Sequence, residues 1–148
     1  MPFNIKDKVE IEEEGNMIKE FTVKTSRRNE FIDITDRVAN IVRESGIEEG
    51  ICTVFIPHTT AGVTINEKAD PNVVRDIISA LEKLVPEGAG YRHLEGNSDS
   101  HIKSTLVGAS EKLVVSSNRL LLGTWQAIFF CEFDGPRTRK CIVQVIKA

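Results

Sequence analysis

The chain has 148 residues, of which 41% are hydrophobic and 28% charged, and its formal net charge is −3. This length suits one domain with one substantial core, and no apolar run approaches the ~18 residues of a membrane span. Because its basic residues are dispersed in a slightly acidic chain, we expect neither nucleic acid nor a membrane as a partner. The charged opening lacks the apolar stretch of a signal peptide, which favours a cytoplasmic protein.

The first third of the chain predicts a strand and a helix. Residues 1–16 are polar and predict a loosely held segment or an edge strand, whereas residues 18–24 alternate apolar and polar like a half-buried strand. Further on, Thr35 or Asp36 can cap a helix that presents one apolar face and ends at Gly46.

The next segment carries a buried strand and the most regular helix. Residues 50–57 are apolar and rich in β-branched residues, which predicts an interior strand with His58 at its carboxyl end. Residues 62–67 alternate again. Asp70 then caps a second helix, with Pro71 in its first turn and apolar residues at helical spacing behind it.

The remaining residues predict a loop followed by strands. Residues 87–104 contain glycines, polar groups and two histidines with little periodicity, which predicts a long functional loop. Residues 112–146 predict a β-meander with two turns. The three cysteines lie in apolar segments without a Cys-x-x-Cys pair and are predicted to be buried free thiols. Together these elements predict a single α+β domain, residues 1–148, with two helices on one face of a largely antiparallel sheet.

All three histidines lie in two polar clusters of the central third, one around His58 and one containing His93 and His101. Imidazole is a common metal ligand and the usual proton carrier near neutral pH. Three histidines can hold zinc with one position open for water, although this spacing matches no specific metal motif. The structural alternative is that His58 and His93 are hydrogen-bonded framework residues and that His101 caps a short helix-like stretch.

Several polar residues near these clusters are further candidates. Glu67 can act as a general base or orient an imidazole, and Asp99 or Glu95 can replace or orient a metal ligand. Thr60, beside Gly62, belongs to a segment that can bind an anion through backbone N–H groups, although turn formation selects the same residue types.

The last strands contribute three more candidates. Trp125 is the only tryptophan, a residue type that is more often core than ligand platform, and Gln126 on an apolar strand needs a hydrogen-bond partner. Arg137 follows a turn, where it can clamp a phosphate or carboxylate, or form a plain ion pair with Glu132 or Asp134.

Five ordered motifs make this sequence resemble the YjbQ family, also labelled secondary thiamine-phosphate synthase. They are residues 58–71, 91–93, 97–103, 123–126 and Glu132. The resemblance implies a sheet curved into a half-barrel, a homotrimer, and in some members a weak thiamine-phosphate synthase activity. That activity joins a pyrimidine methyl diphosphate to a thiazole phosphate and releases pyrophosphate. The matching motif residues are His58, Thr60, Asn66, Glu67, Asp70, His93, Asp99, His101, Trp125, Gln126 and Glu132.

We therefore expect a transferase-like enzyme that acts on phosphorylated small molecules. The catalytic candidates are His58, Glu67, His93, Asp99 and His101; the substrate-binding candidates are Thr60, Asn66, Lys103, Trp125, Gln126 and Arg137. His58, His93 and His101 are the candidate ligands of a divalent metal ion, zinc or magnesium. The alternatives are a metal-dependent hydrolase and a non-catalytic trimeric protein that binds a phosphorylated metabolite or a metal.

Overall fold

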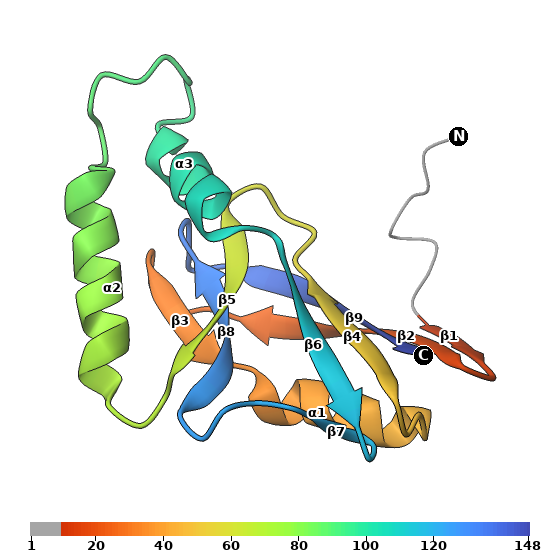
Figure 1. Cartoon of the computed structure of the whole chain (residues 1–148). Coiled ribbons are helices and arrows are strands. Elements are labelled where there is room, and N and C mark those ends of the chain that lie inside the picture. Colours follow the sequence, from red (N-terminus) through yellow and green to blue (C-terminus); the bar gives the residue numbers. More distant parts are fainter. Residues whose placement is uncertain (1–9) are drawn as a thin grey trace.

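The structure is a computed structural model and describes residues 10–148. The first nine residues of the predicted opening segment lie outside the described residues, and the segment's end forms an edge strand (Figure 1). In chain order the elements are β1 (Glu10–Glu13), β2 (Asn16–Lys24), β3 (Glu30–Asp33), α1 (Thr35–Ser45), β4 (Gly50–Phe55), β5 (Ala61–Glu67), α2 (Pro71–Leu84), α3 (Ser98–Val107), β6 (Ser110–Ser116), β7 (Arg119–Leu120), β8 (Gln126–Glu132) and β9 (Thr138–Lys147).

The strands form two antiparallel sheets. The larger sheet has the order β1-β2-β9-β4-β6-β7 and curls into a half-barrel, and the smaller one has the order β3-β8-β5. This confirms the predicted α+β fold and places β4 in the sheet interior, as expected. The predicted meander is wrong, because β8 and β9 belong to different sheets. The reason lies in burial: residues 127–132 of β8 are buried without alternation, between the main core and a second apolar layer, whereas β9 alternates.

Helix α1 confirms the predicted helix and closes the main core. Its buried residues Val38, Ile41 and Val42 share one face, and it ends at Gly46 in the left-handed conformation, with φ of 64°. Its N-terminus differs from the prediction. Neither Thr35 nor Asp36 caps the helix; instead Thr35 donates its Oγ1–H to Asp33.

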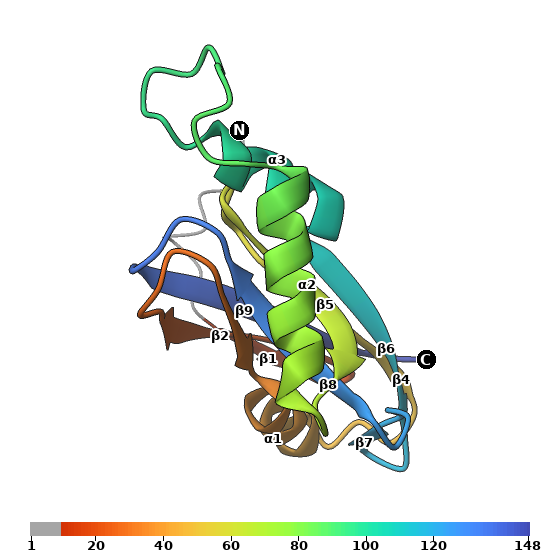
Figure 2. The ribbon, with the colours of Figure 1, turned by 90° about the vertical axis from the view of Figure 1, so that its left-hand side faces the viewer.

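Helix α2 begins as predicted, with the side chain of Asp70 accepting a hydrogen bond from the Asn72 backbone N–H. It lies across the outer face of the small sheet (Figure 2). Val74 and Leu81 pack there against the cluster that contains Phe129. No residue of α2 is buried within the described chain, so its apolar stripe stays partly open to solvent.

Helix α3 corrects the prediction of a loop over residues 87–104. Its buried face is polar, since it consists of Asp99, Ser100 and Lys103, and a helix with such a face has no apolar periodicity to reveal it. Lys103 and Asp99 form an ion pair one turn apart, and Ser100 Oγ donates to the carbonyl of Phe133 at 2.5 Å. These contacts fix α3 against the end of β8.

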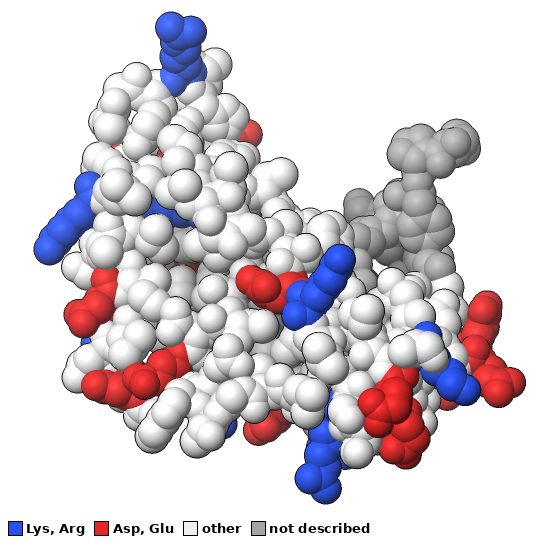
Figure 3. All heavy atoms as spheres, viewed as in Figure 1, with Lys and Arg blue, Asp and Glu red and all other residues white. Residues whose placement is uncertain are grey.

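The cysteines, the helix lengths and the surface charge complete the description of the fold. All three cysteines are free and buried, as predicted, and burial raises the pKa of Cys52 and of Cys141 to about 12. No helix within residues 10–148 is long and apolar enough to cross a membrane. In the view of Figure 3, many charged side chains lie toward the margins of the molecule, and a group of acidic and basic side chains lies near its centre.

Candidate functional site

His58 follows β4 and is fixed by the neighbouring strand β9. Its Nε2 accepts a hydrogen bond from the Lys140 backbone N–H at 2.9 Å. The ring is partly buried, and burial lowers the pKa of His58; nearby Arg139 lowers it further. With Nε2 occupied as an acceptor, a neutral ring carries its proton on Nδ1. His58 therefore offers a hydrogen-bond donor of fixed orientation.

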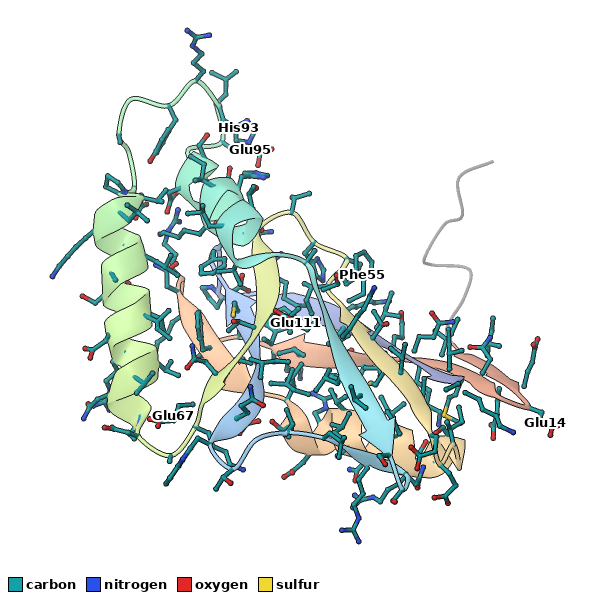
Figure 4. The ribbon with its side chains drawn as sticks, in the orientation of Figure 1. Glu14, Phe55, Glu67, His93, Glu95 and Glu111 are labelled. Atoms are coloured by element: carbon teal, nitrogen blue, oxygen red, sulfur yellow. The ribbon has the colours of Figure 1, made fainter. Side chains whose placement is uncertain are left out.

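The other two histidines come from α3 and from the loop before it. The rings of His93 and His101 are arranged edge to face, with centroids 5.4 Å apart. Glu95 lies on the same loop as His93, and its carboxylate is 3.7 Å from His93 Nε2 (Figure 4). The structure thus brings together all three histidines around one cavity, although they come from distant segments.

A buried ion pair lies beneath this cavity. Glu132 is fully buried, and it accepts a hydrogen bond from Arg139 Nε at 2.9 Å and one from Thr25 Oγ1 at 2.7 Å. Arg139 Nη2 also contacts Glu132 and donates to Thr60 Oγ1 at 2.9 Å. No group within residues 10–148 accepts from the third nitrogen, Nη1, although Arg139 lines the cavity. This nitrogen remains free to donate to an anion.

The rim is organised by Asp134. Its Oδ2 accepts from Arg137 Nη2 at 2.9 Å and from Asn97 Nδ2 at 2.8 Å, and the Arg137 Nε–H donates to the Asp134 backbone carbonyl. The ion pair that the sequence offered as the plainer interpretation of Arg137 therefore exists. Arg137 still lines the cavity, and the buried Oδ1 of Asn97 has no partner among the described residues.

We call this hollow, of about 790 Å³, the histidine cavity. It is defined by His58, Thr60, His93, Glu95, Asn97, His101, Asp134, Arg137 and Arg139 together with the apolar residues around them. Two guanidinium groups and an imidazole N–H can bind an anion, and the remaining imidazoles can move protons. Among the described His, Cys, Asp and Glu side chains, no group of three is placed to hold a metal ion.

Asp99 and Lys103 lie on the other face of α3, outside this cavity. Both are buried; Lys103 Nζ donates to Asp99 at 3.1 Å, and Arg28 donates to the same carboxylate at 2.9 Å. Burial raises the pKa of Asp99, but Lys103 and then Arg28 outweigh it, so the pKa lies below its ordinary value. This arrangement stabilises α3 and thereby the position of His101.

The remaining candidates gather at the opposite end of β5 and β8. Glu67 pairs with Gln126, whereas Ala61, near the histidine cavity, pairs with Glu132. Six residue steps along a strand span about 20 Å, so Asn66, Glu67, Trp125 and Gln126 do not reach the histidines of the same chain. Figure 4 shows Glu67 and His93 far apart, near opposite ends of the molecule.

The contacts in this group are local. Trp125 is 61% exposed, which contradicts the interpretation that it belongs to the core. Gln126 Oε1 accepts from the Gly123 backbone N–H, and this bond supplies the partner that the sequence called for.

Sequence reasoning missed Arg139, the cation at the floor of the cavity. A signal was available, because Arg139 shares the phase of Cys141, Val143 and Val145, the buried residues of β9. A charged residue at a buried strand position requires a partner. Asn97 and Asp134 were also missed as a pair, since their contact joins segments 37 residues apart.

Residues 19–148 match the sequence pattern of a family described as UPF0047 protein YjbQ-like. A UPF0047 protein of Methanocaldococcus jannaschii is 50% identical over 130 residues, which cover 88% of this chain and 94% of that protein. The UPF0047 protein YugU of Bacillus subtilis is 49% identical over 131 residues, covering 88% and 99%.

Solved structures agree with these relatives. A YjbQ/UPF0047 protein of Clostridium acetobutylicum superposes with a TM-score of 0.85 at 53% identity and covers 86% of this chain and 98% of that one. A protein from Sulfolobus solfataricus, described as YbjQ-like and of unknown function, gives a TM-score of 0.87 at 34% identity, covering 90% and 98%.

Proposed function

Because the chain belongs to the UPF0047 family of YjbQ-like proteins, we propose that it is an enzyme that acts on a phosphorylated small molecule in the histidine cavity. The observation that supports this most directly is the convergence of three histidines from separate segments on a hollow whose floor holds Arg139 Nη1, a nitrogen with no acceptor among residues 10–148. A purely structural role explains the Glu132–Arg139 pair but not the histidines on the rim.

The residues of the cavity have distinct roles in this proposal. Arg139 Nη1 and Arg137 bind the phosphate, because guanidinium groups pair with its oxygens in a fixed geometry. His58 donates its Nδ1–H to a phosphate oxygen. His101 and His93 carry the proton that a leaving or attacking group gains or loses.

The reaction class that this proposal favours is group transfer with loss of phosphate or pyrophosphate. Charge then builds up on the departing oxygens, where preorganised cations lower the barrier. A weak thiamine-phosphate synthase activity, as the resemblance implies, belongs to this class.

In this proposal a divalent metal ion binds in the cavity together with the substrate. Magnesium is commonly held by one or two carboxylates and by substrate phosphates, and Glu95 and Asp134 line the cavity. Zinc held by all three histidines requires more change, because His58 Nε2 already accepts the Lys140 N–H and the neutral ring carries its proton on Nδ1.

The proposal also retains the homotrimer that the resemblance implies. Ile51 of β4 lies between Ile146 of β9 and Val114 of β6 on the outer face of the large sheet. These side chains are 51%, 46% and 57% exposed, an apolar row across three strands of the kind that copies bury against one another. Phe55, on the same strand as Ile51, lines the histidine cavity, so the cavity opens beside the proposed contact.

A release assay tests the enzyme proposal. The full chain is incubated with the pyrimidine methyl diphosphate and the thiazole phosphate, with and without magnesium, and pyrophosphate is measured. We expect turnover that falls by about 10²–10⁴-fold in His101→Ala, the range for loss of a general acid–base group. Arg119→Ala, at an exposed position on β7, is the matched control. Equal turnover in His101→Ala and in the parent contradicts proton transfer by His101; phosphate binding without turnover favours the non-catalytic binding protein.

A further inference from the structure

A second hollow, of about 360 Å³, adjoins the histidine cavity. The two share four lining residues, His58, Thr59, His101 and Ala109, which therefore form a ridge between them. Both volumes fall within the roughly 300–1,000 Å³ of ordinary small-molecule sites. Two of the three histidines thus face both hollows, whereas His93 faces only the first.

The two hollows differ in chemistry. The histidine cavity has two arginines and two carboxylates. Apart from the shared ridge, the second hollow is lined by Ala61, Ser104, Thr105 and Gly108, none of which carries a charge. Apart from the two histidines of the ridge, its side chains offer no counter-charge to an ionic group. We call it the neutral hollow.

The hydroxyl groups of Ser104 and Thr105 already donate to backbone carbonyls, so toward a ligand they act as acceptors. Ser104 Oγ donates to the Thr59 carbonyl at 2.6 Å or to the His101 carbonyl at 3.0 Å, and Thr105 Oγ1 donates to the His101 carbonyl at 2.8 Å. Each hydroxyl oxygen keeps acceptor capacity. The neutral hollow therefore suits an uncharged organic group that fills space and carries at most a few hydrogen-bond donors.

We propose that the ligand is a phosphate ester that lies across the ridge, with its phosphate in the histidine cavity and its uncharged organic part in the neutral hollow. This rests on the proposed function and adds the class of substrate to it. The bond between the two parts then lies between His58 and His101. His58 Nδ1–H donates to the bridging or adjacent phosphate oxygen, and His101 is placed to exchange a proton with the organic part.

Affinity measurements with three simple probes test this inference. Inorganic phosphate, methyl phosphate and benzyl phosphate are titrated calorimetrically into the full chain. We expect benzyl phosphate to bind at least 10-fold more tightly than methyl phosphate, because only its ring fills the neutral hollow. Thr105→Trp fills this hollow from an exposed position on α3 and should abolish the preference, while the affinity for inorganic phosphate, which has no organic part, should stay close to that of the parent. Thr124→Trp, at an exposed position in the turn before β8, is the control.

The outcomes separate the two proposals. Equal affinity of benzyl and methyl phosphate in the parent, or a benzyl preference that survives Thr105→Trp, overturns the ester placement while phosphate binding stands. If none of the three probes binds, the phosphate site of the proposed function fails and the ester placement fails with it. A crystal soaked with benzyl phosphate supplies a second readout; a ring located away from Thr105 and Gly108 also overturns the inference.

Discussion

Replacing Glu132 by glutamine should destabilise the fold and strengthen phosphate binding together. Glu132 is fully buried and is the carboxylate partner of Arg139, so Glu132→Gln leaves a buried guanidinium without a counter-charge. Breaking one side of such a pair costs about 3–5 kcal/mol of unfolding free energy. At about 2–4 °C per kcal/mol for a chain of this size, the melting temperature should fall by about 6–20 °C.

The same change raises the net positive charge at the floor of the histidine cavity. Phosphate should therefore bind Glu132→Gln more tightly than the parent, and saturating phosphate should raise the melting temperature of the variant by more. Differential scanning calorimetry with and without phosphate measures both effects. Glu12→Gln, on the exposed edge strand β1, is the control and should change stability by less than about 0.5 kcal/mol. A variant within about 1 kcal/mol of the parent, or one with weakened phosphate binding, would refute this account of the ion pair.

Three further outcomes are expected. Asp99→Asn leaves Lys103 buried without its counter-ion, so in chemical denaturation at pH 7 the variant should be less stable than the parent by about 3–5 kcal/mol. Because the folded pKa of Asp99 is lowered, this difference in unfolding free energy should persist above pH ~3.8 and shrink as pH falls through the folded pKa. A difference that stays constant with pH would contradict this expectation. The lowered pKa of His58 means that the unfolded chain takes up its proton first, so stability should fall as pH drops below about 6.5, and less so in His58→Gln. Parallel pH–stability curves of parent and variant would count against a partly buried neutral ring. Val114→Glu places a charge in the exposed apolar row and should dissociate the proposed trimer, as measured by light scattering. Lys112→Glu, two residues away on β6, is the control. An unchanged molecular mass for Val114→Glu would show that this face is not the contact between copies.

The elements that the sequence predicts correctly are those stabilised by apolar contacts with a local sequence pattern. The sequence predicts helix α2 from its apolar periodicity and strand β4 from an apolar run rich in β-branched residues, and both signals are local in the chain. Helix α3 is not predicted, because it is held by a buried ion pair and by a hydrogen bond to the end of β8, which leave no hydrophobic pattern. Strand β8 was assigned to the wrong sheet because its two buried faces make the usual alternation disappear.

The sequence predicts some residues of the candidate site and misses others for a similar reason. The chain has only three histidines and all lie in polar segments, so the sequence indicates them as candidate site residues. The fold brings them together around one cavity. The motif order groups Glu67 and Trp125 with the histidines, but the length of β5 and β8 places these two residues about 20 Å from the histidine end within one chain. In the sequence Arg139 is one of several dispersed cations, and its role depends on a register that only the paired strands define.

The central claim is that the histidine cavity binds phosphate through Arg139, Arg137 and His58, and nuclear magnetic resonance of the ¹⁵N-labelled chain tests it most directly. Titration with inorganic phosphate should produce saturable shifts at the His58 Nδ1–H and at the Lys140 backbone N–H that the same ring accepts, with little change at the Trp125 indole. The shifts should weaken in Arg137→Ala. The absence of saturable shifts at His58 and Lys140, or equal shifts at Trp125, would contradict the claim.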